Sequence, residues 1–96
     1  MKIRWTSRSL RVRLDDLEVA ALLGGETLET RLEWPGGGWC VRLDPAVDGV
    51  QAEGADIRIG LASVLGELAD PRTEGVRLGG PPRVDVEKDY RPAHLN

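Results

Sequence analysis

The chain has 96 residues and a formal net charge of −3. A chain of this length can build one hydrophobic core, so we predict a single domain over residues 1–96 with a frayed tail at residues 91–96. Charged residues make up 30% of the sequence and hydrophobic residues 41%, which excludes an acidic disordered tail. The single cysteine, Cys40, excludes a disulfide bond within the chain.

The sequence contains no apolar run near the roughly 20 residues that a helix needs to cross a bilayer. Its basic opening, from Met1 to Arg13, lacks the continuous apolar block of a secretory signal. We therefore expect a cytoplasmic protein with no membrane partner.

The opening segment carries positive charges and no acid, at Lys2, Arg4, Arg8, Arg11 and Arg13. A basic patch can bind nucleic acid, but the chain as a whole is acidic and we do not expect a nucleic-acid partner. Arg11 and Arg13 share one face of an alternating segment. They would pair with carboxylates near the other end of the chain if those two segments were neighbouring strands.

The first half of the chain predicts two strands or one bent strand, followed by a helix. Apolar and polar residues mostly alternate from Lys2 to Leu14. Asp15 and Glu18 then form an approximate capping box, which predicts a helix over about residues 16–23. Gly24-Gly25 supplies the left-handed stop that a helix end commonly needs.

Alternation resumes from Thr27 to Trp34 and from Trp39 to Leu43. Between them, Pro35-Gly36-Gly37-Gly38 has the residues that a tight reversal requires, so we predict a β-hairpin. Pairing that is symmetric about this loop sets Trp34 against Trp39 and also Arg31 against Arg42. Like charges directly opposite are unfavourable, so either a bulge shifts the register or these side chains find other partners.

Beyond the hairpin, the pattern predicts a loop to about Gly54, in which a short strand can form near Val50, and then further strands and a helix. The strands are Asp56 to Leu61, Val76 to Leu78 and Arg83 to Tyr90, and the helix covers about residues 62–69. We therefore predict an α+β fold: an antiparallel sheet of about five or six strands, which could curl into a barrel-like shape, covered on one face by the helix at residues 16–23.

The closing strand carries a charge where its pattern calls for an apolar residue. Val84, Val86, Lys88 and Tyr90 share one face, and Asp85, Glu87 and Asp89 share the other. An inward lysine can place its ammonium at the rim, meet a carboxylate or carry chemistry. We favour a rim or paired position for Lys88.

Both ends of the chain resemble a family of small bacterial proteins of unknown function. The resemblance rests on Lys2-Ile3-Arg4, Ser9 to Leu14, Val19 after the start of the helix, and above all Val86-Glu87-Lys88-Asp89-Tyr90, because members tend to finish with valine, glutamate, lysine, aspartate and an aromatic. It implies a compact α+β domain and nothing catalytic. Arg91-Pro92 follows the aromatic here where a cysteine and leucine often stand in the family, so no role of that cysteine carries over.

Two groups of residues are candidates for binding a ligand or partner. The first comprises Lys88, Glu87 and Asp89 of the closing strand with Arg11 and Arg13, which could hold a small anion or, with a desolvated lysine, support catalysis. The second is Trp34 with Trp39, which could anchor a partner; we favour the core for both rings because they continue an inward pattern.

A zinc site or cofactor is not expected. Asp85, Glu87 and Asp89 on one face of the closing strand could hold a hard cation, but such carboxylates more often protect a strand edge or pair with arginines. Cys40 and His94 are far apart in sequence, so we expect neither a nucleophile with its base nor a zinc site. The loop at Gly36 to Gly38 lacks the lysine and hydroxyl residue of a phosphate-binding loop. We predict no cofactor, no metal and no catalytic residues.

The function that the sequence favours is a noncatalytic binding or assembly module of a cytoplasmic bacterial protein, with a second copy of itself (a homodimer) or another protein as its partner. A core this small gains from a subunit interface. The alternative is a small-anion-binding domain or enzyme that uses Lys88 with neighbouring arginines and carboxylates.

Overall fold

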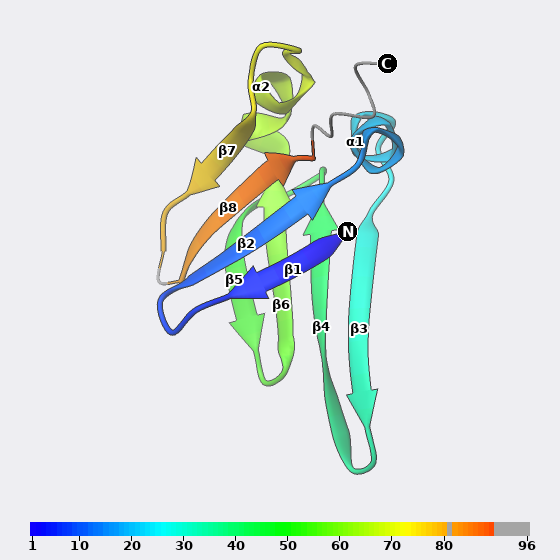
Figure 1. Ribbon diagram of the computed structural model, residues 1–96, viewed down its shortest axis with the longest axis vertical. Helices are drawn as coiled ribbons and strands as arrows, with labels where there is room; N and C mark the ends of the chain where they lie inside the picture. Colours follow the sequence, from blue (N-terminus) through cyan, green and yellow to red (C-terminus); the bar gives the residue numbers. More distant parts are fainter. Residues whose placement is uncertain (81, 90–96) are drawn as a thin grey trace.

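The computed structural model describes residues 1–80 and 82–89. Over these residues the chain forms eight strands and two short helices, arranged in two four-stranded sheets (Figure 1). The predicted tail at residues 91–96 and the predicted inward position of Tyr90 lie outside the described residues.

The two ends of the chain form one sheet, which we call the terminal sheet. Its strands are β1 (Lys2–Trp5), β2 (Ser9–Leu14), β8 (Arg83–Lys88) and β7 (Gly75–Leu78), in that spatial order. The β1–β2 and β7–β8 pairs are antiparallel, and β2 runs parallel to β8 between them. The closing strand therefore lies directly beside the arginine-bearing strand, as its charges predict.

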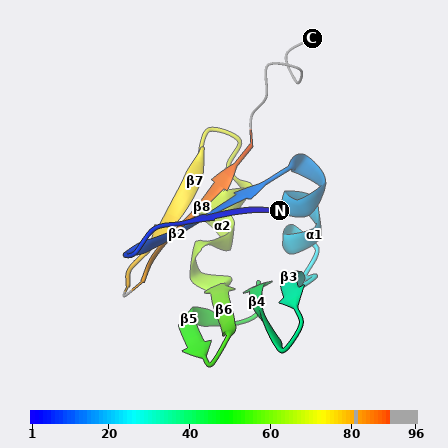
Figure 2. The ribbon, with the colours of Figure 1, turned by 60° about the horizontal axis from the view of Figure 1, so that its bottom comes forward.

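The middle of the chain forms the other sheet, which we call the central sheet. Its strands are β3 (Leu28–Trp34), β4 (Gly37–Asp44), β6 (Asp56–Leu61) and β5 (Asp48–Glu53), in that spatial order. It repeats the scheme of the terminal sheet, because two antiparallel hairpins meet through a parallel pair of β4 and β6. Figure 2 shows the two sheets as separate layers.

The α+β class is confirmed, whereas the prediction of one antiparallel sheet of five or six strands is wrong. Each sheet is mixed and keeps two edge strands, so neither closes into a barrel. Alternation locates strands but does not say which strands pair. Parallel pairs join segments that are far apart in the chain, and no local pattern encodes them. The strand β5, for which we expected a loop with a short strand near Val50, spans Asp48–Glu53.

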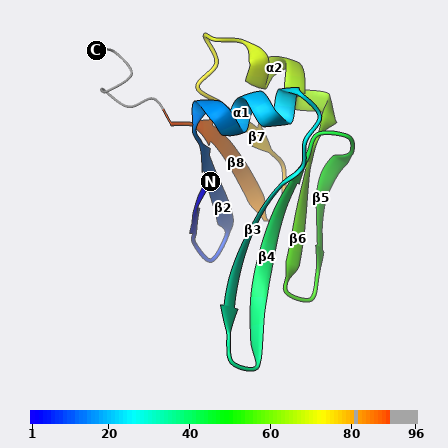
Figure 3. The same cartoon turned by 90° about the vertical axis from the view of Figure 1, so that its right-hand side faces the viewer.

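The helices lie across one end of the two sheets (Figure 3). Helix α1 spans Asp16–Leu23, as predicted. Its capping box is complete, since the Asp15 carboxylate accepts the amide of Glu18 at 2.8 Å and the Glu18 carboxylate accepts the amide of Asp15 at 3.0 Å. A 3₁₀ turn at Ala62–Val64 leads into α2 (Leu65–Ala69), so the predicted second helix is also present.

The core lies between the sheets and under the helices. Its buried members come from β2, β4, β6, β7, β8 and both helices: Leu10, Val12, Leu14, Leu22, Val41, Leu43, Ile59, Leu61, Leu68, Val76, Val84 and Val86. Both sheets bury their alternate apolar residues on facing surfaces. The outer face of each sheet is left to charged residues.

The β3–β4 hairpin turns through two residues, Pro35 and Gly36, rather than the expected four-residue loop. Gly36 has a φ of +88°, which favours glycine, and Trp34 pairs with Gly37. This register differs from the expected one, in which Trp34 faces Trp39, and it sets Arg42 opposite Glu29. The like-charge conflict of the symmetric pairing is thereby removed.

Candidate interaction surface

The outer face of the terminal sheet carries ion pairs between β2, β7 and β8. Arg11 Nε lies 2.7 Å from a carboxylate oxygen of Glu87. Asp85 is only 8% exposed, because Arg77 at 2.8 Å and Arg83 at 3.5 Å cover it. The predicted ion pairing between β2 and the closing strand is therefore confirmed for Arg11. Within residues 1–80 and 82–89, Arg13 lies beside Glu87 in the strand register but makes no ion pair within 4.0 Å, and Asp85 pairs with Arg77 and Arg83 instead.

Lys88 joins the terminal sheet to the end of α2. Its ammonium donates a hydrogen bond to the backbone carbonyl of Asp70 at 2.7 Å, at the C-terminal cap of that helix. A cation at a helix C-terminus is stabilised by the partial negative charge of the last carbonyls. Lys88 is half-buried, and its ammonium ends at the rim of the core beside α2, as favoured from the sequence.

The structure brings most of the first candidate group together. An open hollow of about 250 Å³ is lined by Arg13, Glu74, Glu87, Lys88 and Asp89. Arg11 lines a neighbouring hollow of about 370 Å³ on the same sheet, and it also shares a third hollow, of about 120 Å³, with Arg13. Carboxylates lie among the cations in the first two hollows, so neither is a purely positive site for an anion; the third is lined by Lys2, Ile3, Arg4, Arg11 and Arg13.

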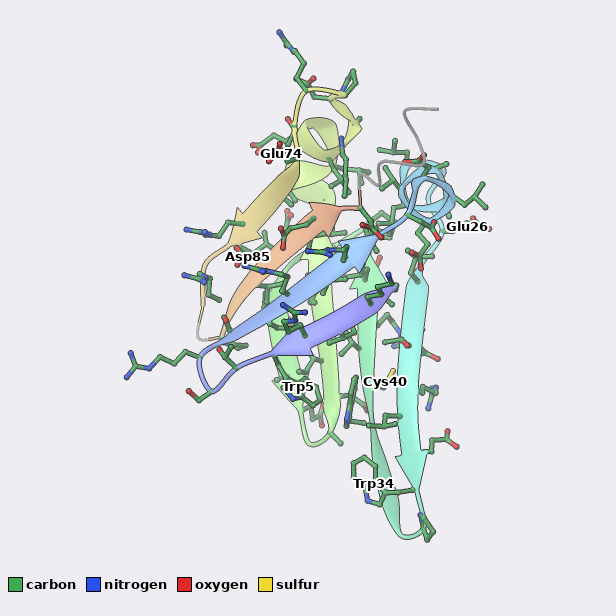
Figure 4. The ribbon with its side chains drawn as sticks, viewed as in Figure 1. Trp5, Glu26, Trp34, Cys40, Glu74 and Asp85 are labelled. Carbon is green, nitrogen blue, oxygen red and sulfur yellow. The ribbon has the colours of Figure 1, made fainter. Side chains whose placement is uncertain are left out.

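The second candidate group forms an apolar surface at the free end of the β3–β4 hairpin. We define the tryptophan surface as Trp5, Leu32, Trp34 and Trp39. Trp5 is 48% exposed, and Leu32 and Trp34 are each 50% exposed. Trp39 is half-buried and packs against the core, with its ring centroid 4.4 Å from that of Trp5. In Figure 4, Trp5 lies above and to the left of Trp34, which is near the tip of the hairpin.

The tryptophan surface exists because the hairpin is longer than the sheet that faces it. Leu32 lies opposite Trp39 and Trp34 opposite Gly37, so these side chains continue the inward face of the hairpin. The hairpin projects past the terminal sheet at the end away from the helices (Figures 1 and 3). Its inward residues therefore leave the core and meet solvent.

The expected core position of the two tryptophans is confirmed only for Trp39. Trp34 is exposed, and Trp5 joins the group although the sequence pattern did not single it out as a candidate. A signal for Trp5 was present, since a tryptophan at the end of a short strand that precedes a polar turn has little chain beyond it to cover it.

The outer face of the same hairpin is charged and internally paired. The Glu29 carboxylate accepts hydrogen bonds from Arg31 at 2.7 Å and Arg42 at 2.6 Å. The bonds from Arg31 first and Arg42 second hold the pKa of Glu29 at about 2. Cys40 lies on this face but is only 4% exposed, and burial raises the pKa of its thiol. A buried, protonated thiol is a poor nucleophile.

Three further findings bear on the kind of protein. Within residues 1–80 and 82–89, no helix is long and apolar enough to span a bilayer. In that same part of the chain, no group of three or more histidine, cysteine or carboxylate side chains gathers to hold a metal ion. Comparisons with protein-family models, curated proteins and solved structures gave no match. The resemblance at the chain ends stays a prediction.

Proposed function

We propose that this protein is a noncatalytic binding or assembly module that engages another protein chain through the tryptophan surface. The observation that carries the proposal is the exposure of Trp5, Leu32 and Trp34 at about half of their surface each. Trp5 contacts Trp39, Leu32 lies opposite Trp39, and Trp34 follows on the same face of β3, so we treat these side chains as one patch rather than as scattered single residues. A cytoplasmic location belongs to the same proposal.

Aromatic side chains are suited to this role. Tryptophan is enriched among the few residues that dominate the energy of protein interfaces, because it buries a large apolar area with little loss of conformational freedom. Trp39 is held by the core and by contact with Trp5, so the patch is preorganised. Preorganisation lowers the entropic cost of binding.

The alternative, a small-anion-binding domain or enzyme around Lys88, has less support. Its ammonium already donates to Asp70, and Arg11 already lies against Glu87. An incoming anion would have to compete with these contacts. Catalysis at Lys88 would also need a second reactive group beside it. Within the described residues the one free thiol, that of Cys40, is buried and lies on the other sheet.

A site-specific photocrosslink tests the proposal. Benzoylphenylalanine would replace Trp34 in one variant and Glu53, an exposed residue on the opposite edge of the central sheet, in a matched variant. In cells of the native host, we expect position 34 to form covalent adducts with a protein chain and position 53 to form none above background. Equal labelling from both positions, or none from position 34, would contradict the proposal.

A further inference from the structure

We infer that the chain engaged by the hairpin is a second copy of this protein, added edge to edge along β3 in an antiparallel register centred on Leu32. This inference rests on the proposed function and names its partner. It follows from the direction of the backbone groups of β3, from the order of its charges and from the exposure of its apolar residues.

Within residues 1–80 and 82–89, strand β3 pairs only with β4, so it is an edge of the central sheet (Figure 1). The direction of its backbone groups follows from β4. The amide of Cys40 donates to the carbonyl of Ala55 at 2.9 Å, so Cys40 turns its backbone groups toward β6. Successive residues of a strand turn these groups to opposite sides, so Trp39 and Val41 turn theirs toward β3.

Leu32 and Thr30 are the partners of Trp39 and Val41 in the β3–β4 register. Their backbone groups are therefore used within the hairpin. The alternate residues Glu29, Arg31 and Glu33 must turn their amides and carbonyls outward, toward the open edge. This edge is a template for a further strand.

A second copy of β3 can pair here by a two-fold axis in only a few central registers. Such an axis sets one residue of β3 directly opposite the same residue of the second copy, because directly opposite residues must point to the same face of the sheet. Near the middle of the strand, that central residue is Thr30, Arg31 or Leu32. A register centred on Arg31 sets that arginine against itself and Glu29 against Glu33 of the second copy. Both contacts are between like charges, which excludes this register.

The two remaining registers differ in which carboxylate meets Arg31. In the register centred on Thr30, Arg31 would lie opposite Glu29 of the second copy, a carboxylate that already accepts hydrogen bonds from Arg31 and Arg42 in its own chain. In the register centred on Leu32, Arg31 lies opposite Glu33 of the second copy. Within the described part of the chain Glu33 makes no ion pair within 4.0 Å, so its carboxylate is available.

The apolar face selects the same register. Centring on Leu32 places this half-exposed side chain against Leu32 of the second copy, and places Trp34 against Thr30 of that copy. On the outer face, Arg31 meets Glu33 of the second copy twice, once on each side of the axis. The two central sheets become one continuous sheet, joined by about four new backbone hydrogen bonds between these outward-turned residues.

Disulfide trapping tests the register. In a Cys40→Ala background, Leu32→Cys would bring two thiols together at a pair without backbone hydrogen bonds, where Cα atoms lie about 4.5 Å apart and a disulfide can form. We expect rapid formation of a covalent dimer on mild oxidation. The matched Thr30→Cys variant should form it far more slowly. A dimer trapped through Thr30→Cys, or through neither variant, would overturn the register.

Charge reversal provides a second measurement on protein that keeps Leu32. Glu33→Arg would face Arg31 of the second copy, and we expect it to raise the dimer dissociation constant in sedimentation equilibrium about tenfold or more. Glu53→Arg makes the same charge change on the other edge of the sheet and should leave the constant unchanged. Equal effects of the two variants would overturn the inference.

The two proposals fail in different ways. A purified protein that stays monomeric at high micromolar concentration, together with adducts from position 34 to a different protein, overturns this inference and leaves the proposed function in place. Absence of position-specific adducts removes the proposed function itself.

Discussion

The indole ring of Trp5 in β1 lies against that of Trp39 in β4, with centroids 4.4 Å apart and planes inclined at 53°. This contact joins the terminal sheet to the central sheet at the end opposite the helices. The buried core lies on one side of it, and the exposed Leu32 and Trp34 lie on the other. The pair therefore marks the boundary between the folded core and the tryptophan surface.

A double-mutant cycle measures what this contact contributes. We expect Trp5→Ala and Trp39→Ala to show a coupling of about 0.5–1.5 kcal/mol in the free energy of unfolding, the range for tilted aromatic pairs. The same cycle between Trp5→Ala and Trp34→Ala is the control and should give a coupling near zero. Strong coupling between Trp5 and Trp34, with none between Trp5 and Trp39, would contradict the ring contact described above.

The hydrogen bond from Lys88 to Asp70 should contribute to stability. Lys88→Met keeps the aliphatic stem but leaves the carbonyl at the end of α2 without its charged donor, so we expect the free energy of unfolding to fall by about 1–2 kcal/mol in urea denaturation. Lys2→Met is the control, because Lys2 is 68% exposed and its ammonium lies 3.8 Å from Asp89. A loss below about 0.5 kcal/mol is expected there.

Glu29 should make stability depend on acid pH. Because Arg31 and Arg42 lower its pKa from 4.5 to about 2 in the folded state, its contribution is complete above the unfolded value. The contribution is lost as pH falls from about 4.5 to about 2. We expect Glu29→Gln to flatten the decline in unfolding free energy over this window.

The titration of Glu29 can also be followed directly by the chemical shift of its carboxyl carbon. Replacing Arg42 with glutamine should move the midpoint upward, because one of the two donors is removed. An unchanged midpoint would contradict the role assigned to Arg42.

Two glycines should respond in opposite ways to the same substitution. A Cβ at Gly38 would meet the Leu32 carbonyl oxygen at 2.7 Å, so Gly38→Ala should push the strands of the hairpin apart and lower the midpoint of thermal unfolding. Gly66 lies within α2 with nothing near its Cβ position. Gly66→Ala should leave that midpoint unchanged or raise it, by up to about 1 kcal/mol in free energy.

The strands and helices were largely predictable because their signals are local. The capping box of Asp15 and Glu18 locates the start of α1, and alternation assigns Val84, Val86, Asp85 and Glu87 to their faces of β8. Asp85 illustrates the limit of that reasoning. It lies on the outer face as predicted but is buried, because arginines from β7 and β8 cover it, and alternation carries no information about such neighbours.

The sheet partners and the tryptophan surface depend on assembly of the whole chain. The like-charge conflict between Arg31 and Arg42 indicated that the symmetric hairpin register needed correction, but only the two-residue turn at Pro35 and Gly36 shows how. Exposure of Trp34 depends on the length of the hairpin relative to the facing sheet. That relation exists only once both sheets have formed.

The central claim is that the open edge of β3 receives another strand, and amide hydrogen exchange tests it most directly. We predict that the outward-turned amides of Arg31 and Glu33 exchange more slowly as protein concentration rises. On the other edge of the sheet, the carbonyl of Val47 accepts a hydrogen bond from the amide of Ala62, so Val47 turns its backbone groups toward β6. Because this direction alternates along a strand, Val50 and Ala52 of β5 turn their amides outward, and these two amides are the controls. Their exchange should not change with concentration. Exchange of Arg31 and Glu33 that is equally fast at every concentration would contradict the account.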